Sequence, residues 1–276
     1  MQSVILILKA IILGIVEGVT EFLPISSTGH MILVGSFMGI NNQDAFWNMF
    51  EVVIQFGAIL AVVVLYRKKI LRSLRELRPG QFGFRLWLGV VLALIPSVIV
   101  AKLFYKKAKA LFQYPVPVAW SMVVGGILLL VLEYIYRHNR KTTRAEDVRP
   151  GQALVIGAFQ CISFLWPGFS RSASTIMGGW VMGLTTACAT EFTFFLAIPT
   201  MFGATVYEMM GATAPLTGVE TVALILGFVV AFIVALLVVK SFLDYLKKKP
   251  LRVFGIYRIV VGVLLLVLGS LKVIHM

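Results

Sequence analysis

Long apolar runs separated by short polar loops dominate this chain. Six of these runs approach the ~20 residues that an α-helix needs to cross a bilayer. They cover residues 52–66, 86–104, 117–136, 192–209, 222–239 and 253–271. We therefore predict an all-α integral membrane protein with six transmembrane helices.

Two further apolar stretches, 4–33 and 153–181, are interrupted in the middle by LPISSTGH and WPGFSRSAS. Proline supplies no backbone donor and disfavours helical geometry in the residue before it, so both helices should break there. A broken helix is tolerated at membrane depth only where protein or a water-filled cavity covers the exposed backbone. We predict that each stretch is a re-entrant helical hairpin.

The two broken stretches also resemble each other in sequence. An ungapped shift of 143 residues places Gly14, Pro24, Ser27 and Gly35 on Gly157, Pro167, Ser170 and Gly178. A similar shift places Glu51 on Glu191. Each half then holds one hairpin and three crossings, and an odd number of crossings inverts the second half. We predict a single membrane domain over 1–276, with an inverted-topology internal repeat at approximately 1–138 and 139–276.

The charge pattern supports a membrane topology. Of the 276 residues, 59% are hydrophobic and 13% are charged, which excludes an ordinary soluble domain. The net charge of +13 arises mainly in short loops at 67–85, 137–149 and 240–252, so we predict no nucleic-acid partner. The opposite side carries Lys106, Lys107 and Lys109. The positive-inside rule then places the first set of loops in the cytoplasm, and the mouth of the first hairpin and both termini outside.

The first broken stretch gathers several reactive side chains. Glu17 and Glu21 are four residues apart and share one helix face. The serine pair, Ser26 and Ser27, precedes a new helix, where a serine is a favourable N-cap. His30 follows Ser27 by three residues, so its imidazole can reach the Ser27 hydroxyl and act as its base. Ser27 as a simple cap remains an alternative, since both roles use the same oxygen.

The second broken stretch places Arg171 at membrane depth. Inserting an arginine there costs about 2.5 to 3.5 kcal/mol, so it needs a partner. Inverted hairpins aim two helix N-termini at one point, and such termini bind anions, while a guanidinium matches phosphate oxygens. We predict a phosphate site, although Arg171 as a mere counter-ion stays open. Its candidate phosphate-binding residues are Ser26, Thr28, Ser170, Arg171, Ser172 and Thr175.

The two glutamates suggest a cation. Glu17 and Glu21 would repel a bare phosphate, and hard divalent cations take carboxylate oxygens. We therefore predict Mg²⁺ or Ca²⁺ between Glu17 and Glu21. Glu51 and Glu191 fit hydrogen bonding to the residues of the site better than direct chemistry.

The motifs EGVTEFLPISSTGH and PGFSRSAST resemble the two signature motifs of the bacterial undecaprenyl-diphosphatase family, integral-membrane phosphatases linked to bacitracin resistance. The resemblance extends over essentially the whole chain. It implies hydrolysis of undecaprenyl diphosphate to undecaprenyl phosphate plus phosphate, which recycles the lipid carrier for peptidoglycan biosynthesis. It also implies the bacterial cytoplasmic (inner) membrane, with the site opening to the periplasmic or outer face. By motif, the family's functional positions fall on Glu17, Glu21, Ser27, His30, Ser170 and Arg171.

These observations lead to an α-helical membrane phosphatase acting on a polyprenyl diphosphate, with membrane lipids around it. Its predicted catalytic residues are Glu17, Glu21, Ser27, His30 and Arg171. The attacking group is either Ser27 or an activated water. A transporter or flippase of polyprenyl phosphate is the alternative, because inverted repeats with broken helices are typical of alternating-access carriers. The sequence does not indicate which oligomeric state the protein has.

Overall fold

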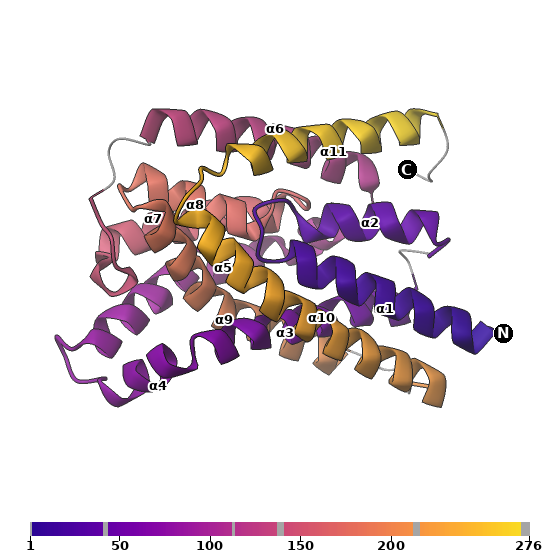
Figure 1. The fold of residues 1–276 in the computed structure, drawn as a ribbon, viewed down its shortest axis with the longest axis horizontal. Helices are drawn as coiled ribbons and strands as arrows, with labels where there is room; N and C mark the ends of the chain where they lie inside the picture. Colours follow the sequence, from indigo (N-terminus) through magenta and orange to yellow (C-terminus); the bar gives the residue numbers. More distant parts are fainter. Residues whose placement is uncertain (1, 41–43, 112–113, 137–140, 212–215, 272–276) are drawn as a thin grey trace.

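The computed structural model describes residues 2–40, 44–111, 114–136, 141–211 and 216–271, and of residues 105–111 and 211 the backbone only (Figure 1). Its regular structure is helical throughout this part, apart from one isolated bridge between Thr142 and Leu184. The helices are α1 (Gln2–Thr20), α2 (Ser27–Phe37), α3 (Ala45–Leu65), α4 (Arg67–Arg75), α5 (Phe82–Leu111), α6 (Pro115–Tyr136), η1 (Ala145–Asp147), α7 (Pro150–Leu165), α8 (Arg171–Val181), α9 (Thr186–Gly211), α10 (Gly218–Leu246) and α11 (Arg252–Ser270).

The long apolar helices make this a multi-pass membrane protein. The six predicted runs coincide with α3, α5, α6, α9, α10 and α11, which confirms the all-α membrane prediction. By length and composition, α1 is a seventh candidate among the described helices. The sequence predicted six crossings because α1 was taken as the first arm of a broken stretch. That stretch does break, directly after α1.

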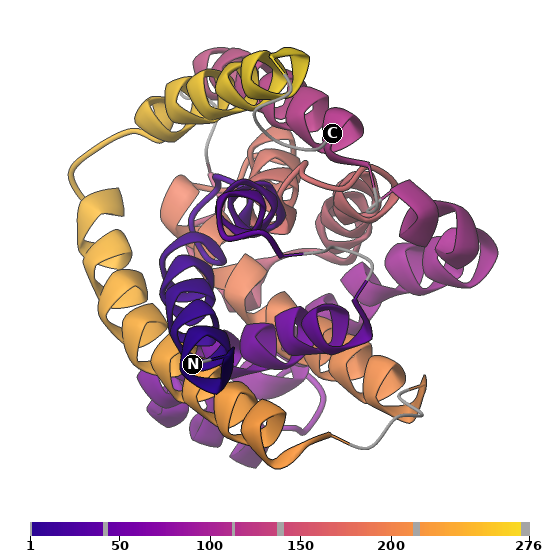
Figure 2. The ribbon, with the colours of Figure 1, turned by 90° about the vertical axis from the view of Figure 1, so that its right-hand side faces the viewer.

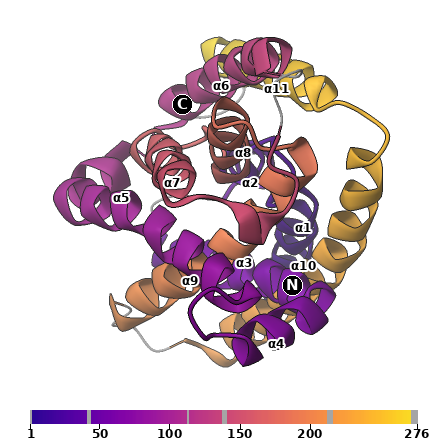
Figure 3. The same cartoon turned by 90° about the vertical axis from the view of Figure 1, so that its left-hand side faces the viewer.

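Each broken stretch forms a pair of helices that pack against each other, α1 with α2 and α7 with α8. α1 and α2 extend towards the end of the molecule that carries the N-terminus, whereas α7 and α8 lie at the opposite end (Figure 1). The end with α7 and α8 also carries α4 and the start of α5 (Figures 1 and 3). The re-entrant character of both pairs stays a prediction. The predicted cluster of Lys106, Lys107 and Lys109 lies outside the described side chains.

The short helices α2 and α8 lie in the middle of the protein. In the end-on views, α2 and α8 are surrounded by the long helices (Figures 2 and 3). α8 is buried throughout residues 172–180. Around them, small residues allow close helix contacts, as expected inside a membrane: a Cβ atom added at Gly14 of α1 would lie 2.6 Å from the carbonyl oxygen of Gly227 on α10. The two breaks are therefore enclosed by protein.

Candidate active site

The first break ends in an unusual serine. Ser26 is the N-cap of α2, and its side chain accepts a hydrogen bond from the Gly29 backbone N–H at 3.2 Å. Its φ of 75° is a conformation that residues with a Cβ atom rarely adopt. Ser27 is the first residue of α2 and does not supply the cap. The capping role that the sequence left open for Ser27 therefore belongs to Ser26.

The second break repeats this geometry. Ser170 caps α8 with a φ of 71° and accepts a hydrogen bond from the Ala173 backbone N–H at 3.3 Å. Among the described residues, Ser26 and Ser170 are the only non-glycine residues with positive φ. Strained backbone of this kind tends to gather at functional sites. By their caps, Ser26 corresponds to Ser170, and Ser27 corresponds to Arg171, one residue away from the ungapped match.

The two breaks meet at Glu21. Its Oε1 atom accepts a hydrogen bond from Nη2 of Arg171 at 2.9 Å, and its Oε2 atom accepts one from the Ser27 hydroxyl at 2.6 Å. The Ser172 hydroxyl donates to the backbone carbonyl of Glu21 at 3.0 Å. Four predicted site residues, which lie up to 151 positions apart, are thereby joined in one hydrogen-bonded cluster.

Two polar atoms beside this cluster have no partner. Oε1 of Glu17 and Nη1 of Arg171 are buried without a hydrogen bond. Leaving such atoms unsatisfied costs about 1 to 3 kcal/mol each, so an orphaned donor and an orphaned acceptor at one site mark a candidate ligand site. Arg171 pairs with Glu21 through Nη2, and its Nη1 makes no hydrogen bond.

The acidic groups suit a shared cation. Glu17 interacts electrostatically with the carboxyl groups of Glu21 and Glu51 and with the guanidinium of Arg171. Within the described part of the chain, no three His, Cys, Asp or Glu side chains converge to hold an ion by themselves. Mg²⁺ commonly uses one or two carboxylates and completes its shell with phosphate oxygens and water. Glu17 and Glu21 fit that kind of site.

His30 lies in this region, but its ring makes no hydrogen bond with the Ser27 hydroxyl. Its Nδ1 atom is 2.7 Å from the carbonyl oxygen of Ser26, and its Nε2 atom is 2.8 Å from the Tyr257 hydroxyl. Because a carbonyl only accepts, Nδ1 carries a proton, and Nε2 of the neutral ring accepts from Tyr257. The predicted bond from imidazole to Ser27 is therefore not formed. The base that touches the Ser27 hydroxyl is Glu21.

Arg258 of α11 is a residue that the sequence reasoning missed. It is fully buried and donates to five backbone carbonyl groups. These acceptors belong to Pro24, Ser121, Met122, Gly168 and Phe169, with the shortest bond, 2.7 Å, to Phe169. Because Pro24 lies in the first break and Gly168 in the second, Arg258 ties the two breaks together. An arginine within an apolar run was a visible signal, by the same argument as for Arg171.

The remaining predicted phosphate contacts divide into two groups. Ser170 and Thr28 are half-buried at the starts of α8 and α2, beside the cluster. Thr175 is fully buried, donates to the carbonyl of Arg171 at 2.9 Å and accepts a hydrogen bond from Thr193 at 2.8 Å. Its hydroxyl is thus committed to the protein interior, and Thr175 is not brought to the site.

Comparison with known proteins adds to this geometry. Residues 10–264 match the family model described as bacitracin resistance protein BacA. The chain is 50% identical over 272 residues to the undecaprenyl-diphosphatase of Clostridium tetani, covering 98% of this chain and 99% of that protein. It is 48% identical to undecaprenyl-diphosphatase 2 of Clostridioides difficile, covering 99% and 98%, and 47% identical to the undecaprenyl-diphosphatase of Caldanaerobacter subterraneus, covering 98% of both.

The chain belongs to the BacA family.

Membership confirms the family resemblance that the two motifs carried. Both breaks fall inside the region matched by the BacA model, as do Tyr257 and Arg258 near its end. The contacts of this BacA-family chain therefore add two residues of α11 to the motif residues. Tyr257 gave no local signal, since it contacts His30 across 227 positions of sequence.

Proposed function

We propose that this chain is an undecaprenyl-diphosphatase, which hydrolyses undecaprenyl diphosphate to undecaprenyl phosphate and phosphate and so returns the lipid carrier to cell-wall synthesis. Family membership and near-complete coverage of relatives with this name support the proposal. The observation that carries it is the pair of unpartnered atoms, Nη1 of Arg171 and Oε1 of Glu17, on the cluster around Glu21. A guanidinium donor and a carboxylate acceptor suit a phosphate and its counter-cation, respectively.

In the proposed reaction, Arg171 binds the terminal phosphate through its available arm. The Ser27 hydroxyl oxygen lies 2.6 Å from Oε2 of Glu21 and donates a hydrogen bond to it. This oxygen attacks the terminal phosphorus atom. The bond from that phosphorus to the bridging oxygen breaks, undecaprenyl phosphate leaves, and the proton passes to Glu21. Water then cleaves the phosphoserine. A divalent cation held by Glu17 and Glu21 would neutralise negative charge on the phosphates.

An apolar hollow of about 390 Å³ supplies a place for part of the lipid chain. It lies between α1, α10 and α11 and is lined by residues such as Val19, Leu23, Leu237 and Phe254. Leu23 belongs to the first break, two residues after Glu21. A polyprenyl chain entering there would leave its diphosphate beside the cluster.

We further propose the topology that the sequence predicts: one membrane domain over 1–276, two re-entrant hairpins and inverted repeats, in the bacterial inner membrane with the site open to the outer face. Loop charge supports it. Gly151 and Gly218 give a matched test, because both are exposed and a side chain at either meets open space. In a background lacking Cys161 and Cys188, Gly218→Cys should react with an impermeant thiol reagent in intact cells, and Gly151→Cys should not. The opposite labelling would reverse the orientation.

The function is tested by phosphate release from undecaprenyl diphosphate, using purified protein in detergent with Mg²⁺, with Ca²⁺ or with a chelator. We expect release with a divalent cation and its loss on chelation. In Glu17→Gln the cation concentration for half-maximal rate should rise, since glutamine keeps the shape and loses the charge. Binding of the lipid without any release of phosphate would contradict the enzyme and favour the transporter.

A further inference from the structure

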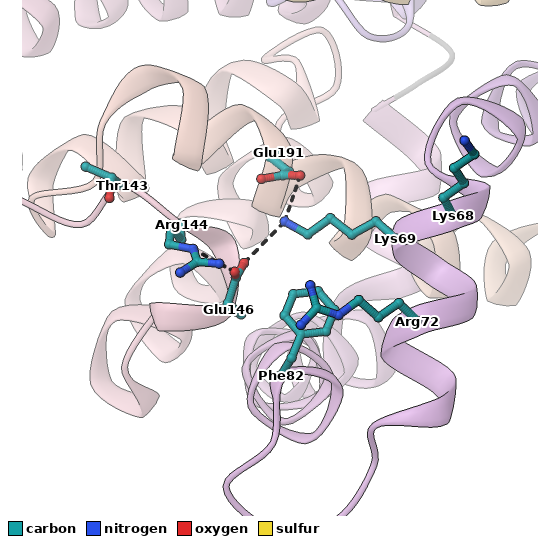
Figure 4. A pocket seen from close by; sticks show the side chains of 8 residues that line it. All are labelled: Lys68, Lys69, Arg72, Phe82, Thr143, Arg144, Glu146 and Glu191. Atoms are coloured by element: carbon teal, nitrogen blue, oxygen red, sulfur yellow. Dashed lines mark hydrogen bonds and ion pairs between the residues drawn. The ribbon is translucent and has the colours of Figure 1, made fainter.

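A second hollow, which is polar and is here called the basic pocket, has a volume of about 360 Å³ and shares no lining residue with the cluster around Glu21 (Figure 4). It opens between α4, the first residue of α5, residues 143–146 and the first turns of α9. Its charged lining comprises four basic side chains, Lys68, Lys69, Arg72 and Arg144, and two acidic ones, Glu146 and Glu191. Neither Glu21 nor Arg171 contributes to it.

Ion pairs brace the walls of the basic pocket. Lys69 lies between Glu146 and Glu191, with Nζ to carboxylate distances of 3.2 and 3.0 Å (Figure 4). Arg144 pairs with the other oxygen of Glu146 at 2.9 Å. Burial acts to raise the pKa of Glu146, but its backbone hydrogen bond and Lys69 outweigh burial and lower that pKa below its usual range. Glu146 is therefore charged at neutral pH, and these pairs are fully formed.

Basic donors remain after these pairs are made. Arg72 binds Glu76 through Nε alone, and its guanidinium carbon lies 4.8 Å from the centre of the Phe82 ring (Figure 4). Lys68 takes part in none of the described ion pairs of the pocket. With four basic groups against two acidic ones, the lining carries a surplus of positive charge. That surplus suits an anion with several acceptor oxygens.

Helix α4, which carries Lys68, Lys69 and Arg72, is suited to the membrane surface. Leu71 and Leu74 of α4 are 53% and 52% exposed, although they alternate with basic residues. A short helix with exposed apolar and basic residues is typical of the lipid headgroup region. The indole of Trp87 on α5 donates to Ser73 at 2.9 Å and holds α4 in place. The predicted topology places loops 67–85 and 137–149 in the cytoplasm, so the basic pocket opens on the cytoplasmic side of the molecule.

We propose that the basic pocket binds the phosphate of an anionic phospholipid from the cytoplasmic leaflet, with Lys68, Arg72 and Arg144 as donors. Basic pockets between helices on the cytoplasmic side are a recurrent way to recognise such headgroups. The surplus of basic groups on the predicted cytoplasmic side favours an anionic headgroup. This site is independent of the proposed phosphatase reaction, because it shares no residue with the cluster around Glu21.

Native mass spectrometry of the purified full-length chain, titrated with phosphatidylglycerol or phosphatidylcholine, tests the proposal. Phosphatidylglycerol should bind more tightly. Each basic contact is worth about fivefold in affinity, so the double variant Arg72→Gln/Arg144→Gln should bind phosphatidylglycerol roughly twenty-five-fold more weakly. The matched control, Arg67→Gln/Arg75→Gln, removes the same number of charges outside the pocket lining and should weaken binding clearly less than the pocket variant does.

Equal losses in the two double variants would reduce the effect to general surface charge and overturn the site. So would equal binding of the two lipids by the wild type. Displacement of phosphatidylglycerol by the same concentration of inorganic phosphate would make the ligand a free anion and overturn the lipid assignment. If the pocket variant fails to fold, Lys68→Gln decides: weaker binding than in Arg75→Gln supports the site, and equal binding overturns it.

Discussion

Arg171 and Arg258 both lie among apolar helices of this protein, yet their surroundings differ. Arg171 pairs with Glu21 and keeps Nη1 without a partner. Arg258 is fully buried and donates to five backbone carbonyl groups. In our proposal the first binds the phosphate, and the second holds the two breaks in position. Their place among apolar helices marks both residues as important, but only their hydrogen bonds distinguish a binding role from a supporting one.

The largest expected effect follows from replacing the planar grip of Arg171. In Arg171→Lys the charge remains but the two-point contact is lost. Phosphate release should fall about a hundredfold or more, as when one transition-state donor is removed. The apparent unfolding temperature should change by less than about 3 °C, because the salt bridge to Glu21 can re-form. Near-normal release would reduce Arg171 to a counter-ion.

Replacing Arg258 should change the stability of the protein more than its phosphate release. Arg258→Met leaves several buried carbonyl groups without a donor, which should lower the apparent unfolding temperature in detergent by roughly 6 to 12 °C. Arg258→Lys should recover part of this loss, because an ammonium group also donates to carbonyls. An unchanged unfolding temperature in the methionine variant would show that Arg258 does not hold the breaks.

The smallest effect is expected at the caps. Glycine adopts positive φ without strain and caps nearly as well as serine, so Ser26→Gly should change stability by less than about 0.5 kcal/mol. Ser170→Gly is the matched control in the second break. Ser26→Gly should retain phosphate release within about threefold. A large loss of release in Ser26→Gly alone would assign chemistry to the Ser26 hydroxyl and not only to Ser27.

The comparison also shows how far sequence reasoning reaches. Apolar runs predicted the long helices because a bilayer demands continuous apolar surface. The prolines and polar residues predicted both breaks. The sequence left the cap open between Ser26 and Ser27, since the choice depends on the backbone φ of Ser26, which the dipeptide does not reveal.

The pattern of apolar and polar residues could not predict contacts between segments that are distant in sequence. The bond between Tyr257 and His30 depends on how α11 packs beside α2, so local spacing favoured Ser27 as the partner of His30 instead. The argument used for Arg171, that an arginine among apolar residues needs a partner, could also have singled out Arg258. Its acceptors are backbone carbonyls from three segments, and these are invisible in sequence.

The central claim is that both breaks act on one phosphate, and a double-mutant cycle of Ser27→Ala and Arg171→Lys tests it most directly. Phosphate release from undecaprenyl diphosphate would be measured for the wild type, both single variants and the double variant. Residues that act as one unit are not additive, so the double variant should release phosphate within about threefold of the slower single variant. Losses that multiply would place Ser27 and Arg171 in independent roles and contradict a shared site.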